Sequence, residues 1–129
     1  MKTEEKLGIW MDHSEAHLIE FSIDKVAIRT IHRDQSEKST DDQKRSEKQA
    51  NNKKRNQQEA FYKKIWAIAK SYKQVLLFGP TEAKSEFFNE IRADHANDNV
   101  TITLRNTGKM TAEEMHEFVY KYFKPIMLP

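Results

Sequence analysis

The residues of this chain that are most clearly suited to binding chemistry are cations gathered in one basic stretch. Eight of them are candidates for nucleic-acid contact: Lys44, Arg45, Lys48, Lys53, Lys54, Arg55, Lys63 and Lys64. Such side chains bind RNA phosphates with an affinity that falls as salt is added. The alternative interpretation is a solvated run of charge without a ligand. No aromatic residue lies between positions 33 and 58 to stack on bases, which weakens the case for recognition of single strands.

A second candidate is an anion site at the turn Gly79-Pro80-Thr81, with Lys84 close behind it. A strand that ends at Gly79 and leads into a helix would direct free backbone N–H groups and the Lys84 ammonium at a bound anion. The competing interpretation is a helix cap made by the Thr81 hydroxyl, which is the commoner role of Thr at such a position. Both interpretations remain open at the level of sequence.

Acidic and imidazole groups make only a weak case for catalysis. Asp12 follows the first predicted strand, a position from which a carboxylate can bind the metal ion of a nuclease, but such enzymes need several convergent carboxylates. No other acidic or imidazole residue falls convincingly at a second ligand position; those considered are Glu15, Glu20, Asp98, His13, His17, His32, His95 and His116. No nucleophile has a recognisable base partner. We therefore expect no catalytic residue, metal site or cofactor.

Composition bounds what else the chain can be. At 129 residues it can bury one hydrophobic core, and we expect a single domain spanning residues 1–129. The absence of cysteine excludes disulfides and thiolate zinc sites. No signal peptide or membrane-spanning run is found, so a cytoplasmic protein with no membrane partner is expected. The net charge of +2 is too small to indicate nucleic-acid binding, and the local distribution of charge must decide.

The elements that must position these residues begin with three predicted strands, at 7–11, 16–23 and 26–32. The second and third of these alternate between apolar and polar residues, and β-branched side chains are enriched in them. The short connections between them predict antiparallel pairing. The first connection, 12–15, consists of residues that readily form hydrogen bonds with their own backbone.

Residues 33–58 break this pattern, because Ala50 is their only apolar residue. A connection of this length is usually functional or disordered. We predict a mobile loop to about residue 41, followed by a solvent-exposed helical extension, since the second half contains no Gly or Pro. The helix gains an apolar face only between Phe61 and Tyr72.

The second half of the chain alternates strands with helices. Residues 75–78 form an apolar run typical of a strand covered on both faces, and Gly79 and Pro80 end it. Apolar residues then recur at helical spacing from 83 to 91. Residues 100–105 alternate as in a half-exposed strand near a sheet edge. Thr111 and Glu114 have the spacing of a capping box for the last helix.

The resulting order, β-β-β-α-β-α-β-α, predicts an α/β fold with a mixed five-stranded sheet. Three antiparallel strands are followed by strands joined through helices, and right-handed crossovers then favour the spatial order 3-2-1-4-5. Helices should cover both faces of this sheet. This is the ribonuclease H-like arrangement.

Three stretches of the sequence resemble the middle domain of the eukaryotic and archaeal peptide-chain release factor and its relative Pelota. Residues 9–12 and 16–20 resemble that domain's opening hairpin. Residues 33–72 stand where the family has its catalytic loop and long helix, and 75–86 is similar to its strand, Gly-containing turn and helix with a Lys. The resemblance spans residues 7–124 and points to bacterial release-factor-like proteins. It implies a ribonuclease H-like fold and a role in translation.

One departure from the family bears on catalysis. Release factors end this loop in Gly-Gly-Gln, which positions water against the ester of peptidyl-tRNA, whereas no glycine lies between Gly8 and Gly79 here. Since other residues cannot adopt the backbone angles open to glycine, Gln49, Gln57 and Gln58 should not inherit the catalytic role.

The sequence therefore favours a non-catalytic, translation-associated protein that contacts the ribosome or structured RNA through its basic loop and helix. Two alternatives stay open. One is a metal-dependent nuclease that uses Asp12, and the other is a protein-interaction domain whose edge strand, 100–105, pairs with a partner.

Overall fold

The computed structural model describes residues 6–21, 26–33, 47–94 and 100–124, without the side chains of 26–27, 47–52 and 93–94. The strands are β1 (Lys6–Met11), β2 (Glu15–Phe21), β3 (Val26–His32), β4 (Gln74–Gly79) and β5 (Thr101–Asn106). The helices are α1 (Glu47–Ala69), α2 (Ala83–Asp94) and α3 (Ala112–Phe123). Their order along the chain is the predicted one.

β1 is the strand about which the sheet is built. It pairs antiparallel with β2, where Ile9 lies opposite Leu18, and parallel with β4, where Ile9 lies opposite Leu77. β3 pairs antiparallel with β2, and β5 pairs parallel with β4, so that the order is β3-β2-β1-β4-β5. The predicted mixed five-stranded sheet and its 3-2-1-4-5 order are confirmed.

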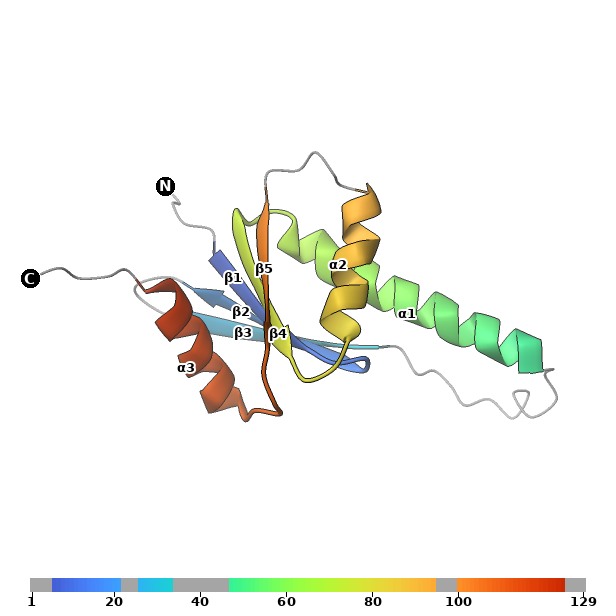
Figure 1. The fold of residues 1–129 in the computed structure, drawn as a ribbon, viewed down its shortest axis with the longest axis horizontal. Helices are drawn as coiled ribbons and strands as arrows, with labels where there is room; N and C mark the ends of the chain where they lie inside the picture. The colour runs from blue at the N-terminus through green and yellow to red at the C-terminus, as the bar shows by residue number, and fades with distance from the viewer. Residues whose placement is uncertain (1–5, 22–25, 34–46, 95–99, 125–129) are drawn as a thin grey trace, which may run out of the picture.

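The three helices cover both faces of the sheet, as predicted. Figure 1 shows α1 and α2 together on one side and α3 on the other. Side chains of successive residues in a strand point to opposite faces, so each central strand supplies two cores. In β4, Val75 and Leu77 join the core under α1 and α2, whereas Leu76 and Phe78 join the core under α3. This is why β4 reads as a continuous apolar run.

The contact between α3 and the sheet depends on the absence of a side chain at Gly8. A Cβ atom at this position would lie only 2.3 Å from Cγ2 of Val119, well inside van der Waals contact. Val119 is fully buried and belongs to the core on this face. Glycine in β1 therefore lets the helix approach the strand closely.

Two predicted boundaries need comment. The second strand was predicted to reach residue 23 and is described as far as Phe21, because residues 22–25 lie outside the described ones. α1 ends at Ala69 instead of continuing to Tyr72, because the chain tightens there into a turn in which the Tyr72 N–H donates to the Ala69 carbonyl. α1 begins at Glu47, within the predicted helical extension, and the loop predicted before it falls in residues 34–46, which are not described.

β3 forms one edge of the sheet, and its two faces differ in burial among the described residues. Ile31 is buried in the core under α1 and α2, whereas Ile28, on the opposite face, is 41% exposed. The main contacts of α3 within the described sheet are with β1 and β2. In the part of the chain that is described, no helix is long and apolar enough to cross a membrane.

Candidate functional site

The N-terminal half of α1 forms an arm, defined here as residues 47–57. The other half packs on the sheet, with Phe61, Ile65 and Ala69 buried at successive turns. The residues of the arm with described side chains are exposed at 54–56 and half-buried at 53 and 57. In Figure 1 this green half of the helix extends beyond the end of the sheet. The arm is therefore a helix that projects from the domain.

The eight candidate cations do not share one surface. Lys44 and Arg45 lie outside the described residues, and Lys48 lies in the helix at a position whose side chain is not described. Lys53 is half-buried and has a polar or electrostatic contact of its own. Lys54, Arg55, Lys63 and Lys64 are all exposed.

Helical periodicity divides the exposed cations between two sides of α1. Lys54 lies seven residues before the buried Phe61, and Arg55 seven residues before Tyr62, so each pair shares a side of the helix. Lys54 and Arg55 thus occupy the side that packs on the domain further along, but they do so where the helix has passed the end of the sheet. Lys63 and Lys64 lie on the outer, solvent-facing side.

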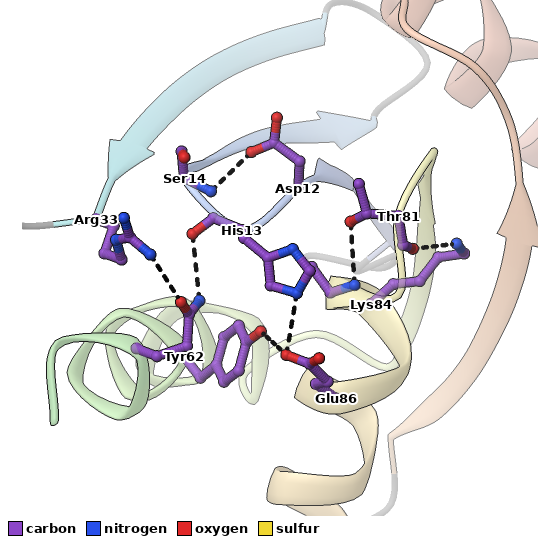
Figure 2. Close-up of polar contacts among 10 residues, drawn as sticks. Asp12, His13, Ser14, Arg33, Tyr62, Thr81, Lys84 and Glu86 are labelled. Atoms are coloured by element: carbon purple, nitrogen blue, oxygen red, sulfur yellow. Dashed lines mark hydrogen bonds and ion pairs between the residues drawn. The ribbon is translucent and has the colours of Figure 1, made fainter. Parts of the chain in front are cut away.

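Four residues connect the base of the arm to the rest of the domain, and we call them the anchor ring: His13, Gln58, Tyr62 and Glu86. Gln58 Nε2 donates to the His13 carbonyl at 3.2 Å, and the Tyr62 hydroxyl donates to Glu86 Oε1 at 2.9 Å. The circuit closes through His13 Nε2, which lies 3.1 Å from the same Glu86 oxygen (Figure 2). The ring thereby ties α1 to the β1–β2 turn and to α2.

Arg33, directly after β3, forms a hydrogen bond with a member of the anchor ring. Its Nη1 donates to Gln58 Oε1 at 3.0 Å, and its backbone N–H donates to the Ser14 carbonyl at 2.8 Å. Gln58 therefore uses both ends of its amide, one toward β3 and one toward the β1–β2 turn. Because His13 and Glu86 are about half exposed, their pairing is weakened by solvent, and the more buried Tyr62 bond contributes more.

Burial, and then the hydrogen bond to Glu86, raise the pKa of the Tyr62 hydroxyl well above its ordinary value. The hydroxyl therefore remains a proton donor at any physiological pH. Its ring also packs edge-on against Phe87 at a centroid distance of 5.7 Å. Tyr62 is thus held by its apolar ring as well as by its polar end.

At the predicted anion site, the Lys84 ammonium contacts backbone carbonyl groups of the turn. Lys84 is only 4% exposed, and its Nζ donates to the Thr81 carbonyl at 2.8 Å and to the Gly79 carbonyl at 3.1 Å. Thr81 Oγ1 accepts the Ala83 N–H at 3.1 Å, as a cap does. These contacts hold the turn together from within (Figure 2). Anion binding here stays a prediction, with the Lys84 ammonium already engaged by carbonyl groups.

The Asp12 side chain accepts backbone hydrogen bonds within the β1–β2 turn, as predicted for residues 12–15. Its Oδ1 accepts the N–H groups of Ser14 at 2.8 Å and of Glu15 at 2.9 Å. Glu15 lies near His17 and His32 on the β2–β3 surface, at 3.4 and 3.7 Å. Among the described residues, no three His, Asp or Glu side chains are grouped so that they could hold a metal ion. The nuclease alternative stays a prediction.

Sequence reasoning missed the anchor ring. Its members are separated along the chain by as many as 73 residues, the distance between His13 and Glu86. The available signal was that Gln58 and Tyr62 are one helical turn apart and continue the buried side of α1, which marks Gln58 as a polar residue at the domain boundary.

The fold of this chain is similar to part of the structure of several translation factors. Neither a protein-family model nor a curated protein sequence matches the chain significantly. Solved structures do match over nearly the whole chain, at low sequence identity. Similarity at this level concerns the fold alone.

Three of these structures illustrate the match. Archaeal translation termination factor aRF1 gives a TM-score of 0.62 at 14% identity over 94% of this chain and 35% of its own. Pelota of Archaeoglobus fulgidus gives 0.61 at 11% identity over 95% and 32%. Dom34 of S. cerevisiae, described as a translation termination-like factor that interacts with Hbs1, gives 0.53 at 13% identity over 92% and 34%. The chain spans about a third of each of these proteins, and its resemblance to the release factor and Pelota middle domain is confirmed as one of fold.

Proposed function

We propose that this protein is a non-catalytic binding protein of the translation apparatus, which contacts the ribosome or structured RNA through its basic arm. The observation that carries the proposal is the exposed pair Lys54 and Arg55 on a helix that projects beyond the sheet. Exposed cations on a projecting helix are available to the phosphates of a large partner. The fold shared with Pelota, Dom34 and aRF1 supports the connection with translation.

Binding is favoured over hydrolysis by the composition of the segment before the arm. No glycine lies between Gly8 and Gly79, so a Gly-Gly-Gln turn cannot be formed there. The proposed contact set comprises Lys44, Arg45, Lys48, Lys53, Lys54, Arg55, Lys63 and Lys64. Because the four exposed cations described on α1 lie on two sides of the helix, we place Lys54 and Arg55 at the centre of the contact and Lys63 and Lys64 at its margin.

The proposal is tested by sedimentation of the protein with ribosomes through sucrose gradients at low and high salt. Replacement of Lys53, Lys54 and Arg55 by Glu should lower the affinity at low salt by on the order of tenfold or more and reduce its dependence on salt. The matched control replaces Lys70, Lys73 and Lys109, three exposed cations away from the arm, and changes the net charge equally. An equal loss in the control would show that overall charge, and not the arm, is responsible.

A further inference from the structure

The anchor ring lies at the point where the arm leaves the domain. The apolar contacts of α1 begin at Phe61, and Gln58 lies almost one turn further toward the arm. Hydrogen bonds from Gln58 and Tyr62 reach two other parts of the fold, the β1–β2 turn and α2, and Arg33 adds the end of β3. A helix attached to three surrounding elements cannot tilt or rotate freely. The ring therefore extends the fixed part of α1 beyond its apolar core.

The arm amplifies any change at this attachment. Its 11 residues, 47–57, span about 16 Å at the rise of an α-helix. A tilt of about 20° at Gln58 would move the tip by roughly 6 Å on that length. Lys54 and Arg55 would change their positions accordingly. The direction of the arm is thus determined by a few bonds at its base, two of which involve the charged groups of Glu86 and Arg33.

We propose that the anchor ring fixes the direction of the arm in the free protein, and that the ligand is therefore a structured RNA whose phosphates are themselves held in place. This inference rests on the proposed function and names its ligand class. Cations that are positioned in advance lose little freedom on binding, and that advantage is realised only against an equally fixed array of phosphates. A flexible single strand adapts to an arm in any direction, and proteins that bind such strands present aromatic rings for stacking. Positions 33–58 contain no aromatic residue.

The test uses a variant that breaks the ring without changing any charge, Gln58→Ala with Tyr62→Phe. Phe at position 62 keeps the packing of the aromatic side chain against Phe87. The matched control, Gln74→Ala with Tyr122→Phe, makes the same two changes at exposed positions outside both the ring and the arm. Thermal unfolding confirms that both proteins remain folded. Each is titrated with a double-helical RNA hairpin and with an oligouridine that carries the same number of phosphates.

The ring variant should bind the hairpin about fivefold or more weakly, with the slope of affinity against salt unchanged because the same cations are present. Its affinity for oligouridine, and the affinity of the control for both RNAs, should stay at the wild-type value. Equal weakening for hairpin and oligouridine, or none for either, would overturn the assignment of a structured ligand.

A second measurement reads the direction of the arm without RNA. The chain contains no cysteine, so Asn52→Cys and Glu113→Cys allow two spin labels to be placed, one on the arm and one on α3. Pulsed electron resonance should give a narrow distance distribution in the wild-type and control backgrounds and a broad one in the ring variant. Identical distributions would show that the ring does not set the direction. A narrow wild-type distribution without binding of either RNA would instead refute the proposed function and leave the positioning role established.

Discussion

The hydroxyl of Tyr62 in α1 donates a hydrogen bond of 2.9 Å to Oε1 of Glu86 in α2. This contact joins two helices on the same face of the sheet, and it shares its acceptor oxygen with His13 of the β1–β2 turn. Burial, and then the Glu86 bond, raise the pKa of Tyr62 above its ordinary value of 10.0. The folded protein therefore holds this proton more tightly than the unfolded chain does.

The first prediction concerns the pH dependence that this contact creates. A raised pKa in the folded state contributes stability that is present below pH 10 and is lost as pH rises above it. The free energy of unfolding of the wild type should therefore fall above pH 10, relative to Tyr62→Phe, by up to about 1.4 kcal/mol per pH unit. At neutral pH the substitution should cost about 1–2 kcal/mol. Urea unfolding below and above pH 10 measures both effects, with Tyr122→Phe as the control, and parallel curves for wild type and Tyr62→Phe would contradict the assignment.

The second prediction concerns Gly79, which has a positive φ of 151° at the end of β4. A Cβ atom here would lie 2.2 Å from the Met11 carbonyl oxygen, a backbone atom that cannot easily move away. Gly79→Ala should therefore destabilise the protein by about 2–4 kcal/mol in denaturant unfolding. Gly108→Ala is the control, because a Cβ atom there meets nothing within 4 Å and the change should stay within about 0.5 kcal/mol. Equal effects at the two positions would refute the steric argument.

The third prediction separates the two roles considered for Lys84. If its ammonium serves the carbonyls of Gly79 and Thr81, Lys84→Met should cost about 1–3 kcal/mol even in buffer free of phosphate and sulfate, since those acceptors lose their donor. The exposed Lys73 provides the control, and Lys73→Met should change stability by less than about 0.5 kcal/mol. A Lys84→Met protein with unchanged stability that no longer gains stability from added phosphate would favour the anion site.

The fourth prediction concerns the outer edge of β5. Thr101 and Thr107 donate their N–H groups toward β4, so the alternate residues Ile102, Leu104 and Asn106 direct their backbone groups away from the sheet. Arg105 partly covers this edge, because its Nη1 donates to the Leu104 carbonyl at 3.1 Å while its guanidinium lies 5.6 Å from the centre of the Tyr122 ring. Charged residues protect edge strands from pairing with other chains in this way.

Arg105→Thr should therefore increase self-association, as measured by sedimentation velocity over a range of protein concentrations. Thr favours the extended backbone, so the strand itself should persist. Lys109→Thr removes the same charge from the neighbouring loop and should leave the protein unchanged. Association in both variants would mean that loss of charge, and not exposure of the Leu104 carbonyl, is the cause.

The elements that were predicted correctly depend on local patterns. The apolar run 75–78 indicated a strand covered on both faces, and these residues are all buried in β4 beside β1. The spacing of Thr111 and Glu114 indicated a capping box, and both reciprocal hydrogen bonds are present at 2.9 and 3.1 Å. Such signals involve residues within one turn of each other, which is why the sequence alone reveals them.

The candidate site was harder to predict because its contacts are not local. Gln58 meets the His13 carbonyl across 45 residues, and nothing in the composition of either segment indicates that they lie together. Lys84 was a candidate to face a bound anion at the helix start, but the turn before it presents two carbonyls that its long side chain can reach. The basic stretch was found as charge, and the structure shows that the half of α1 that carries Lys54 and Arg55 projects as an arm.

The position of β1 between an antiparallel and a parallel neighbour has a consequence for how the chain acquires its structure. Leu7 meets Glu20 through a short hairpin, but it meets Val75 only after the chain has passed through β3 and α1. Strands β1–β3 can therefore assemble early, whereas attachment of β4 must wait for closure of a much longer loop. Extra residues inserted before Glu47 should accordingly slow refolding more than they alter equilibrium stability, which makes the segment carrying the arm part of the rate-limiting event in folding.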